Sequence, residues 1–144
     1  MAERDDRQAL DRRLAYALLR LTLGINIFVH GAVRLPALGT FVEGMVRQFA
    51  DTPLPGVAVR LFALSLPFLE AGVGLLLIVG LWTRWALVAG ALEIAALVFG
   101  TALRSDWETL GIQMLYPIIY YVLLAGRAYD YFALDTLRTK QPGD

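Results

Sequence analysis

Two acidic residues, Glu70 and Glu93, lie within long apolar stretches and need a chemical explanation. A carboxylate in hydrocarbon is costly unless it is protonated, paired or in contact with water. Counted from Trp82 at 1.5 Å per helical residue, both carboxyls would lie roughly 16 to 18 Å from one tight turn, near the centre of a bilayer. Two carboxyls at one depth could share a proton or bind the same polar group. We therefore take Glu70 and Glu93 as the catalytic candidates.

Two other apolar stretches carry polar residues at similar depth. Asn26 and His30 follow Thr22 at steps of four, which places them on one face of a helix that leads to Arg34. In the last stretch Gln113, Tyr116 and Tyr120 share a face, beside Pro117. The candidates for holding a cofactor are Asn26, His30, Gln113, Tyr116 and Tyr120. The pattern predicts a polar pocket inside a helical bundle, open toward its outer half.

A structural role for the same residues stays open. Small residues such as Gly74 and Gly90 lie on the faces that carry the two acids, and such faces are typical of close helix packing. Protonated Glu70 and Glu93 could then be interhelical hydrogen-bond donors without any ligand. His30 could equally be a structural donor near the outer interface.

The elements that carry these residues are predicted by composition. Of the 144 residues 58% are hydrophobic and 18% are charged, and a soluble globule of this length could not bury that much apolar surface. We expect an all-α membrane protein, a four-helix up-and-down bundle, as a single transmembrane domain over residues 1–144. The predicted spans are 14–33, 57–80, 85–103 and 110–126, with an N-terminal segment 1–13 and a tail 127–144.

The distribution of Arg and Lys predicts the orientation. Eight of these residues would lie on the side that holds both termini and four on the other side. The positive-inside rule then places both termini in the cytoplasm, in a multi-pass protein of the cell (inner) membrane. The inverted orientation is the alternative, because acids accompany the N-terminal arginines. The charged segment 1–13, with no small-residue cleavage site after the first span, is not typical of a cleaved signal peptide.

Three features outside the spans carry further expectations. Thr40 and Glu43 form a capping-box pattern that opens an amphipathic helix, either an interfacial helix on the outer leaflet or a lid over a lateral opening. Arg20 could pair with a carboxylate inside the bundle, but its height favours the cytoplasmic headgroups. The tail from Arg127 is predicted to be an amphipathic interfacial segment, which anchors to the membrane or docks a cytoplasmic partner.

Several function classes are excluded by composition. The net charge is zero, so no nucleic-acid partner is expected. The chain has no cysteine, which removes disulfides, thiolate nucleophiles and iron–sulfur ligation. Because His30 is the one histidine, a bis-histidine haem is excluded, while a His–Met pair is left open; we expect no metal and no haem. Redox chemistry would need an organic cofactor or a partner subunit.

Two short motifs with several glycines lie in the first span and in the predicted hairpin of the second and third spans. Their residues are Arg20, Gly24, Phe28, His30, Gly31, Arg34 and Leu35, followed by Glu70, Gly72, Gly74, Leu77, Gly80, Thr83 and Arg84. These motifs resemble the DoxX family of small four-span membrane proteins. The resemblance covers roughly residues 14–103, and Glu93 matches no motif. Where family members usually have lysine after the His-Gly pair, this chain has Arg34, which keeps the charge.

The resemblance implies a membrane subunit of a quinone-linked oxidoreductase, because the family's namesakes are associated with thiosulfate:quinone oxidoreductase and terminal quinol oxidase. Our leading hypothesis is a quinone-binding subunit in which Glu70 and Glu93 contact the headgroup; whether the chain is itself an enzyme stays open. The alternatives are a membrane scaffold for a soluble redox or stress-response enzyme and a small proton-coupled permease. The permease would have to form a homo-oligomer.

Overall fold

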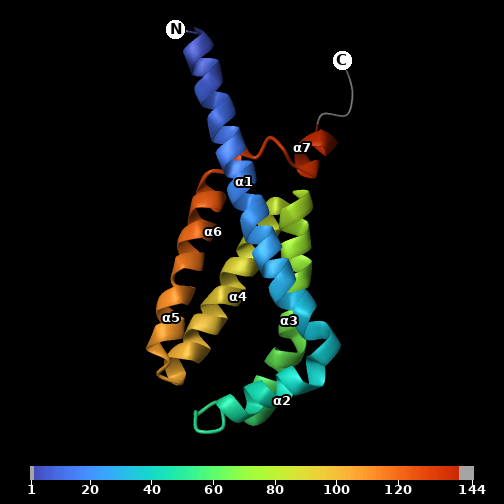
Figure 1. The fold of residues 1–144 in the computed structure, drawn as a ribbon, viewed down its shortest axis with the longest axis vertical. Coiled ribbons are helices and arrows are strands. Elements are labelled where there is room, and N and C mark those ends of the chain that lie inside the picture. The colour runs from blue at the N-terminus through green and yellow to red at the C-terminus, as the bar shows by residue number, and fades with distance from the viewer. Residues whose placement is uncertain (1, 140–144) are drawn as a thin grey trace.

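A computed structural model describes residues 2–139, and within this range the chain is helical with no strand. Helices α5 and α6 lie nearly end to end and together make the fourth span (Figure 1). The elements are α1 (Ala2–Arg34), η1 (Leu35–Ala37), α2 (Leu38–Gln48), α3 (Gly56–Val79), α4 (Thr83–Leu103), α5 (Trp107–Gln113), α6 (Leu115–Ala125), η2 (Arg127–Tyr129) and α7 (Leu134–Thr139).

The described residues contain four helical segments long and apolar enough to cross a membrane, which confirms the predicted four-span fold class. They lie within residues 4–48 and at Gly56–Val79, Thr83–Leu103 and Trp107–Ala125. The side chains that point outward from these segments are largely apolar, with Leu18, Leu92 and Ile118 all at least 60% exposed. This exposed apolar surface is typical of a protein surrounded by lipid.

The first helix is longer and the last span less regular than the sequence pattern predicts. Helix α1 begins at Ala2. The helix of the first apolar span continues toward the N-terminus because the charged residues of segment 1–13 are compatible with a helix. The fourth span is interrupted at Met114. Pro117 lacks an N–H and cannot bond to the carbonyl of Gln113, so the helical ladder is broken there.

Glycines bring α1 and α3 together. A Cβ atom on Gly31 would lie 2.4 Å from both the amide nitrogen of Ala71 and the carbonyl oxygen of Pro67. A Cβ on Gly74 would lie 2.2 Å from the amide nitrogen of Phe28. The two backbones therefore touch over two turns, and each of these glycines is required by the close approach.

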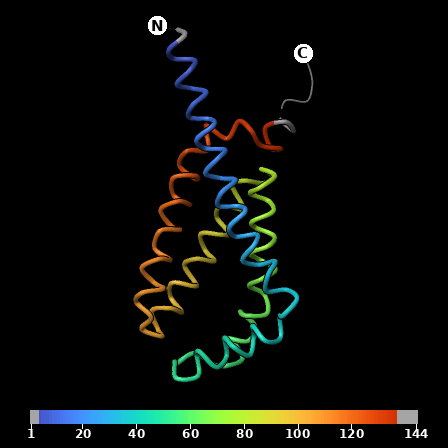
Figure 2. The backbone as a smooth tube through the Cα atoms, viewed as in Figure 1, coloured from blue at the N-terminus to red at the C-terminus, as the bar shows by residue number. Residues whose placement is uncertain are grey.

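Helix α1 packs along α3, and α4 packs along α5 and α6, and these two groups of helices diverge from one end of the bundle to the other. Figure 2 shows α3 and α4 close together at their connecting turn and wide apart near α2. The beginning of α1 and the whole of α7 lie at the narrow end (Figure 1). We call these ends the turn end and the α2 end.

One local prediction is wrong, and the tail makes a contact that was not predicted. Helix α2 begins at Leu38 and has no side-chain cap, so Thr40 is an interior residue; Glu43 instead accepts a hydrogen bond from Arg60, at 2.7 Å. The helix itself exists as expected, with Val42 buried. The tail 127–139 folds against the turn between α3 and α4, a contact that the sequence pattern does not predict, while residues 140–144 of the predicted tail lie outside the described part.

Candidate functional site

An ion pair between α1 and α3 lies at the α2 end. Arg34, the last residue of α1, donates from Nη1 to both carboxylate oxygens of Glu70 in the middle of α3. Glu70 is only 4% exposed, whereas the Arg34 side chain keeps 27% of its surface accessible. The glycine contact at Gly31, one turn earlier, brings the two helices close enough for this pair. The pair compensates the cost of burying the carboxylate.

His30 lies beside this pair. Its Nδ1 is 3.4 Å from Nη2 of Arg34, and the guanidinium carbon of Arg34 lies 4.9 Å from the centre of the Phe41 ring on α2. Arg34 is thus held by a carboxylate on α3 and a ring on α2. This places a fixed positive charge at the rim of the space between the helices.

A cavity of about 290 Å³ extends from the ion pair to α4, α5 and α6. We call it the chamber. Two of its polar atoms, Oε2 of Glu93 and Oε1 of Gln113, are buried and have no hydrogen-bond partner among the described residues. Its chemically active lining consists of His30, Arg34, Glu70, Glu93, Gln113, Tyr116 and Tyr120.

These two oxygens give the chamber its chemical character. Buried acceptors without a partner are uncommon in folded proteins and indicate a bound molecule or an ordered water. The chamber therefore offers acceptors at Glu93 and Gln113 and a cationic donor at Arg34. A guest with hydroxyl or N–H groups would satisfy the acceptors.

The wall formed by Tyr120 depends on a glycine. Tyr120 is 3% exposed, and a Cβ on Gly90 of α4 would lie 2.2 Å from its hydroxyl oxygen. Any other residue at position 90 would push the ring away from α4. Gly90 therefore allows the phenol to line the chamber beside Glu93.

The structure brings six of the seven predicted site residues to the chamber. They are Glu70, Glu93, His30, Gln113, Tyr116 and Tyr120. Asn26 is the exception: it lines a separate cavity of about 210 Å³ between α1 and the last span, which Tyr116 also borders. Ile112 and Tyr116 line both cavities, whereas Asn26 does not contribute to the chamber lining.

Sequence reasoning did not select Arg34 as a site residue. It was assigned to the outer connection, although it continues the stripe of residues at steps of four through Asn26 and His30. That spacing was the available signal, because it places Arg34 one turn beyond His30 on the same face. No group of three or more potential metal ligands occurs in the described part of the chain.

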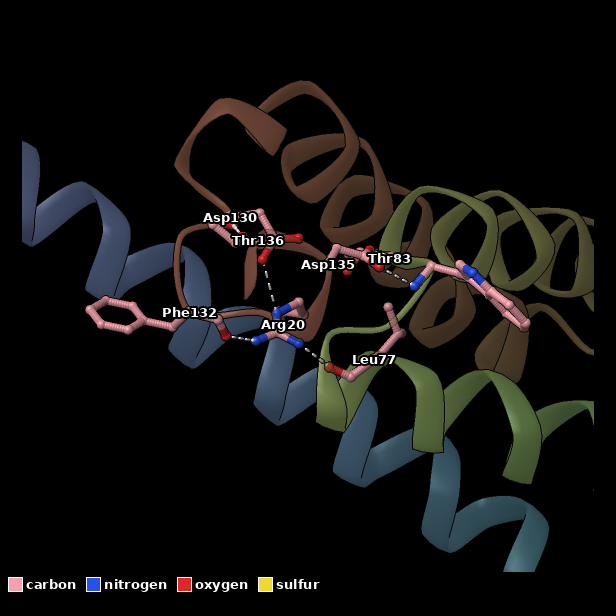
Figure 3. Close-up of polar contacts among 8 residues, drawn as sticks. Arg20, Leu77, Thr83, Asp130, Phe132, Asp135 and Thr136 are labelled. Atoms are coloured by element: carbon pink, nitrogen blue, oxygen red, sulfur yellow. Dashed lines mark hydrogen bonds and ion pairs between the residues drawn. The ribbon is translucent and has the colours of Figure 1, made fainter. Parts of the chain in front are cut away.

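A second cluster lies at the turn end, around Arg20 (Figure 3). Arg20 is 4% exposed and donates to the carbonyl oxygens of Leu77 and Phe132, at 2.5 and 2.6 Å. Its Nε lies 3.4 Å from Oδ1 of Asp130. Arg20 therefore does not extend to the headgroups, as the sequence favoured, because the tail supplies a carboxylate and a carbonyl within reach.

The tail also caps the hairpin of α3 and α4. The carboxylate of Asp135 accepts hydrogen bonds from the backbone N–H groups of Trp82 and Thr83, both at 2.8 Å, at the beginning of α4. Arg20 binds a free carbonyl in the last turn of α3. The signs of both charges match the helix dipoles.

The two carboxyls of this cluster have opposite pKa shifts. Burial raises the pKa of Asp130, and the nearby Arg20 opposes this shift only in part. For Asp135 burial acts in the same upward direction, but the N–H groups of Thr83 and Trp82 outweigh it and lower the pKa.

A family model described as methylamine utilisation protein MauE matches residues 12–108, which is more than half of the chain. The chain belongs to the MauE family. The match includes the Arg34–Glu70 pair and Glu93, whereas the wall of the chamber from α5 and α6 lies beyond it. No curated protein and no solved structure matches the chain.

Membership of the MauE family corrects the resemblance to DoxX. Five of the fourteen residues that suggested DoxX are glycines, and three of them, Gly24, Gly31 and Gly74, lie where α1 and α3 touch. Such glycines report close helix packing, which different membrane families share. This member of the MauE family has four helical segments able to span a membrane, and the link to thiosulfate:quinone oxidoreductase that the DoxX resemblance implied does not apply.

Proposed function

We propose that this MauE-family protein binds a small quinone-type molecule in the chamber, as the membrane component of a redox enzyme system. The observation that carries the proposal is the pair of buried acceptors without partners, Glu93 Oε2 and Gln113 Oε1, in a cavity that also contains the Arg34–Glu70 pair. A quinol has two hydroxyl groups that can donate to these acceptors, and Arg34 can donate to a ring oxygen.

The chain's own residues would bind and orient the headgroup. Tyr116 and Tyr120 supply flat apolar surface beside the acceptors, and Leu66 and Ile94 close the chamber around the polar groups. Electron transfer would require another component, because the described residues contain no metal cluster site and the sequence has no cysteine.

Binding to protein in lipid nanodiscs tests the proposal. The probe is tetramethylbenzoquinol, which has a headgroup but no chain. Gln113→Leu should lower its affinity about tenfold, since it removes one acceptor at little cost to the fold. Glu108→Gln is the matched control, because Glu108 is exposed on the same helix and lines no described cavity. Absence of binding to the wild type, or equal binding by Gln113→Leu, would contradict the proposal.

We propose as a second candidate function a membrane scaffold for the maturation of an enzyme of methylamine utilisation, which is the process that the family description names. The structural feature in its favour is the first part of α1, which projects beyond the bundle with exposed charges of both signs (Figure 1). The tail is less suited to docking a partner, because it is packed against Arg20 and the α3–α4 turn.

Deletion analysis in a methylamine-utilising host separates the two functions. Removing residues 2–11 should abolish enzyme maturation under the scaffold function while quinol binding by the purified protein persists. Under quinone-type binding, Gln113→Leu should impair maturation and the deletion should have little effect. The measurement is the amount of active enzyme per cell, normalised to the amount of membrane protein.

A further inference from the structure

A second cavity adjoins the chamber. Its volume is about 480 Å³, and it lies between α2, α3, α4 and α5. The two cavities share a wall, so each opens onto the same side chains. The shared residues are Arg34, Met45, Leu97, Thr109 and Gln113.

The lining of the second cavity differs in kind from that of the chamber. Four phenylalanines line it, together with small and aliphatic residues from α3 and α4, and neither Glu70 nor Glu93 reaches it. Its two arginines are both engaged: Arg34 pairs with Glu70, and Arg104 lies 3.6 Å from Asp106. The apolar lining consists of Phe41, Met45, Phe49, Leu54, Ala58, Val59, Phe62, Ala96, Leu97, Phe99 and Gly100.

Helix α2 forms the cover of this second cavity. Phe41 and Met45 of α2 and Phe49 at its C-cap follow one another at steps of four and line the cavity, while Val42 is buried. The Glu43–Arg60 ion pair attaches α2 to the beginning of α3. Gly100 lies directly below Phe49, since a Cβ there would be 3.1 Å from the ring. The cover thus consists of aromatic and thioether groups that adapt to an apolar guest.

We propose that the second cavity holds the apolar chain of the molecule whose headgroup occupies the chamber. The ligand is then a chain-bearing amphiphile, with a hydrogen-bonding ring and an aliphatic or isoprenoid substituent. This inference rests on the proposed function. It adds to it the class of ligand, because the arrangement of a polar and an apolar cavity along a shared wall matches a molecule with two such parts.

The physical contribution of the chain is selectivity more than affinity. A lipid chain is already in an apolar medium, so entering the cavity yields packing contacts and little hydrophobic transfer free energy. A filled cavity would instead exclude the chain by overlap, with a penalty far above the gain from packing. Steric blocking is therefore the sharper test.

The experiment compares two quinols in nanodiscs: tetramethylbenzoquinol and a ubiquinol analogue with a decyl chain. Ala96→Phe places a ring at the wall of the second cavity and should weaken binding of the decyl analogue about tenfold, with the ring-only probe unaffected. Ala95→Phe is the matched control, because Ala95 is exposed on the same helix and lines neither cavity. Ala58→Phe, from the α3 wall, repeats the test if Ala96→Phe does not fold.

The outcomes separate the inference from the proposed function. If Ala96→Phe and Ala58→Phe bind the decyl analogue as tightly as the wild type does, the second cavity does not hold the chain. The inference is then overturned, while headgroup binding stands. If Ala96→Phe binds the decyl analogue more weakly but binds tetramethylbenzoquinol normally, and Ala95→Phe binds both normally, the inference is supported. If the wild type binds neither quinol, the proposed function fails and the inference fails with it.

Discussion

The bundle contains two arginine clusters, one at each end, and they differ in what surrounds the guanidinium. At the turn end Arg20 is enclosed by protein: two backbone carbonyls accept from it and Asp130 lies beside it. At the α2 end Arg34 has a carboxylate partner but faces two cavities. The first arrangement closes a structure, and the second leaves a charged group accessible to a guest.

The difference shows how the same residue type serves stability or binding. Arg20 satisfies helix-end carbonyls that have no helical partner, so its hydrogen bonds complete the fold. Arg34 pairs with the side chain of Glu70 and not with the backbone carbonyls of a helix end. The pair adjoins acceptors without partners at Glu93 and Gln113. Asp130 Oδ1 at the turn end also lacks a hydrogen-bond partner, but neither Arg20 nor Asp130 lines the two cavities, so the accessible site is the one at Arg34.

Removing Arg20 should have the largest effect on this comparison. Arg20→Met would leave the carbonyls of Leu77 and Phe132 without their donor and Asp130 without its cation, so we expect a loss of about 3–5 kcal/mol in the free energy of unfolding. The measurement is denaturation in detergent micelles. Arg4→Met, at an exposed position on the same helix, should change stability by less than about 0.5 kcal/mol. Similar losses of stability in both variants would show that the contacts of Arg20 do not contribute more than an exposed arginine does.

The Arg34–Glu70 pair should behave differently, with stability and binding separable. Either single change, Arg34→Met or Glu70→Met, leaves one charge unpaired, and we expect a loss of about 2–3 kcal/mol. The double variant removes both charges and should recover most of that stability, because an apolar pair of similar volume is tolerated. It should still fail to bind tetramethylbenzoquinol. Recovery of binding in the double variant would show that the pair is only structural.

The contrast between the two clusters also explains what the sequence could and could not predict. Apolar runs set by bilayer thickness predict the four spans, and the depth of Glu70 and Glu93 predicts that both reach one cavity. Arg20 bonds mainly to backbone carbonyls, and such bonds leave no pattern of residue types. Its assignment to the headgroups failed for that reason.

One contact that was not predicted and one prediction that failed each have a physical reason of their own. The tail's docking depends on Asp135 reaching N–H groups more than fifty residues earlier in the chain, which local periodicity does not encode. The apparent capping box at Thr40 failed because η1 continues into α2 almost without interruption, so the helix begins at Leu38. In the tail, long-range hydrogen bonds decide the structure, and at Thr40 the helix start is decided by the preceding turn. Local sequence patterns report neither.

A substitution at Gly90, in the wall of the chamber, should have a smaller effect on stability than the arginine substitutions. Gly90→Ala would place a methyl group in contact with the Tyr120 hydroxyl, and we expect a loss of about 1–2 kcal/mol in stability together with reduced quinol binding. Gly72→Ala is the control, since no atom lies within 4 Å of the added carbon, and it should be neutral or slightly stabilising. Thermal unfolding and ligand titration measure both. Normal binding in Gly90→Ala would mean that the position of Tyr120 is not critical.

The smallest expected loss of stability is that of a substitution at Asp135, which tests only the Arg20 cluster at the turn end. Asp135→Asn removes the negative charge and one of two good acceptors at the beginning of α4, so we expect a loss of about 1 kcal/mol at pH 7. The folded-state pKa of Asp135 lies below its ordinary value of 3.8, so its stabilising contribution is present above that value and is lost as the pH falls through the folded pKa.

Asp130 gives the opposite sign, which makes the pair a sensitive test. Its folded-state pKa is raised by burial, so protonation favours the folded state, and the wild type should gain stability relative to Asp130→Asn as the pH falls toward 3.8. The stability advantage of the wild type over Asp135→Asn should instead shrink below pH 3.8. Denaturation of the three proteins across this pH range measures both trends, and parallel curves would contradict the different environments of the two carboxyls. Quinol binding at pH 7 should be unchanged in both variants, because neither carboxyl lines the chamber at the opposite end.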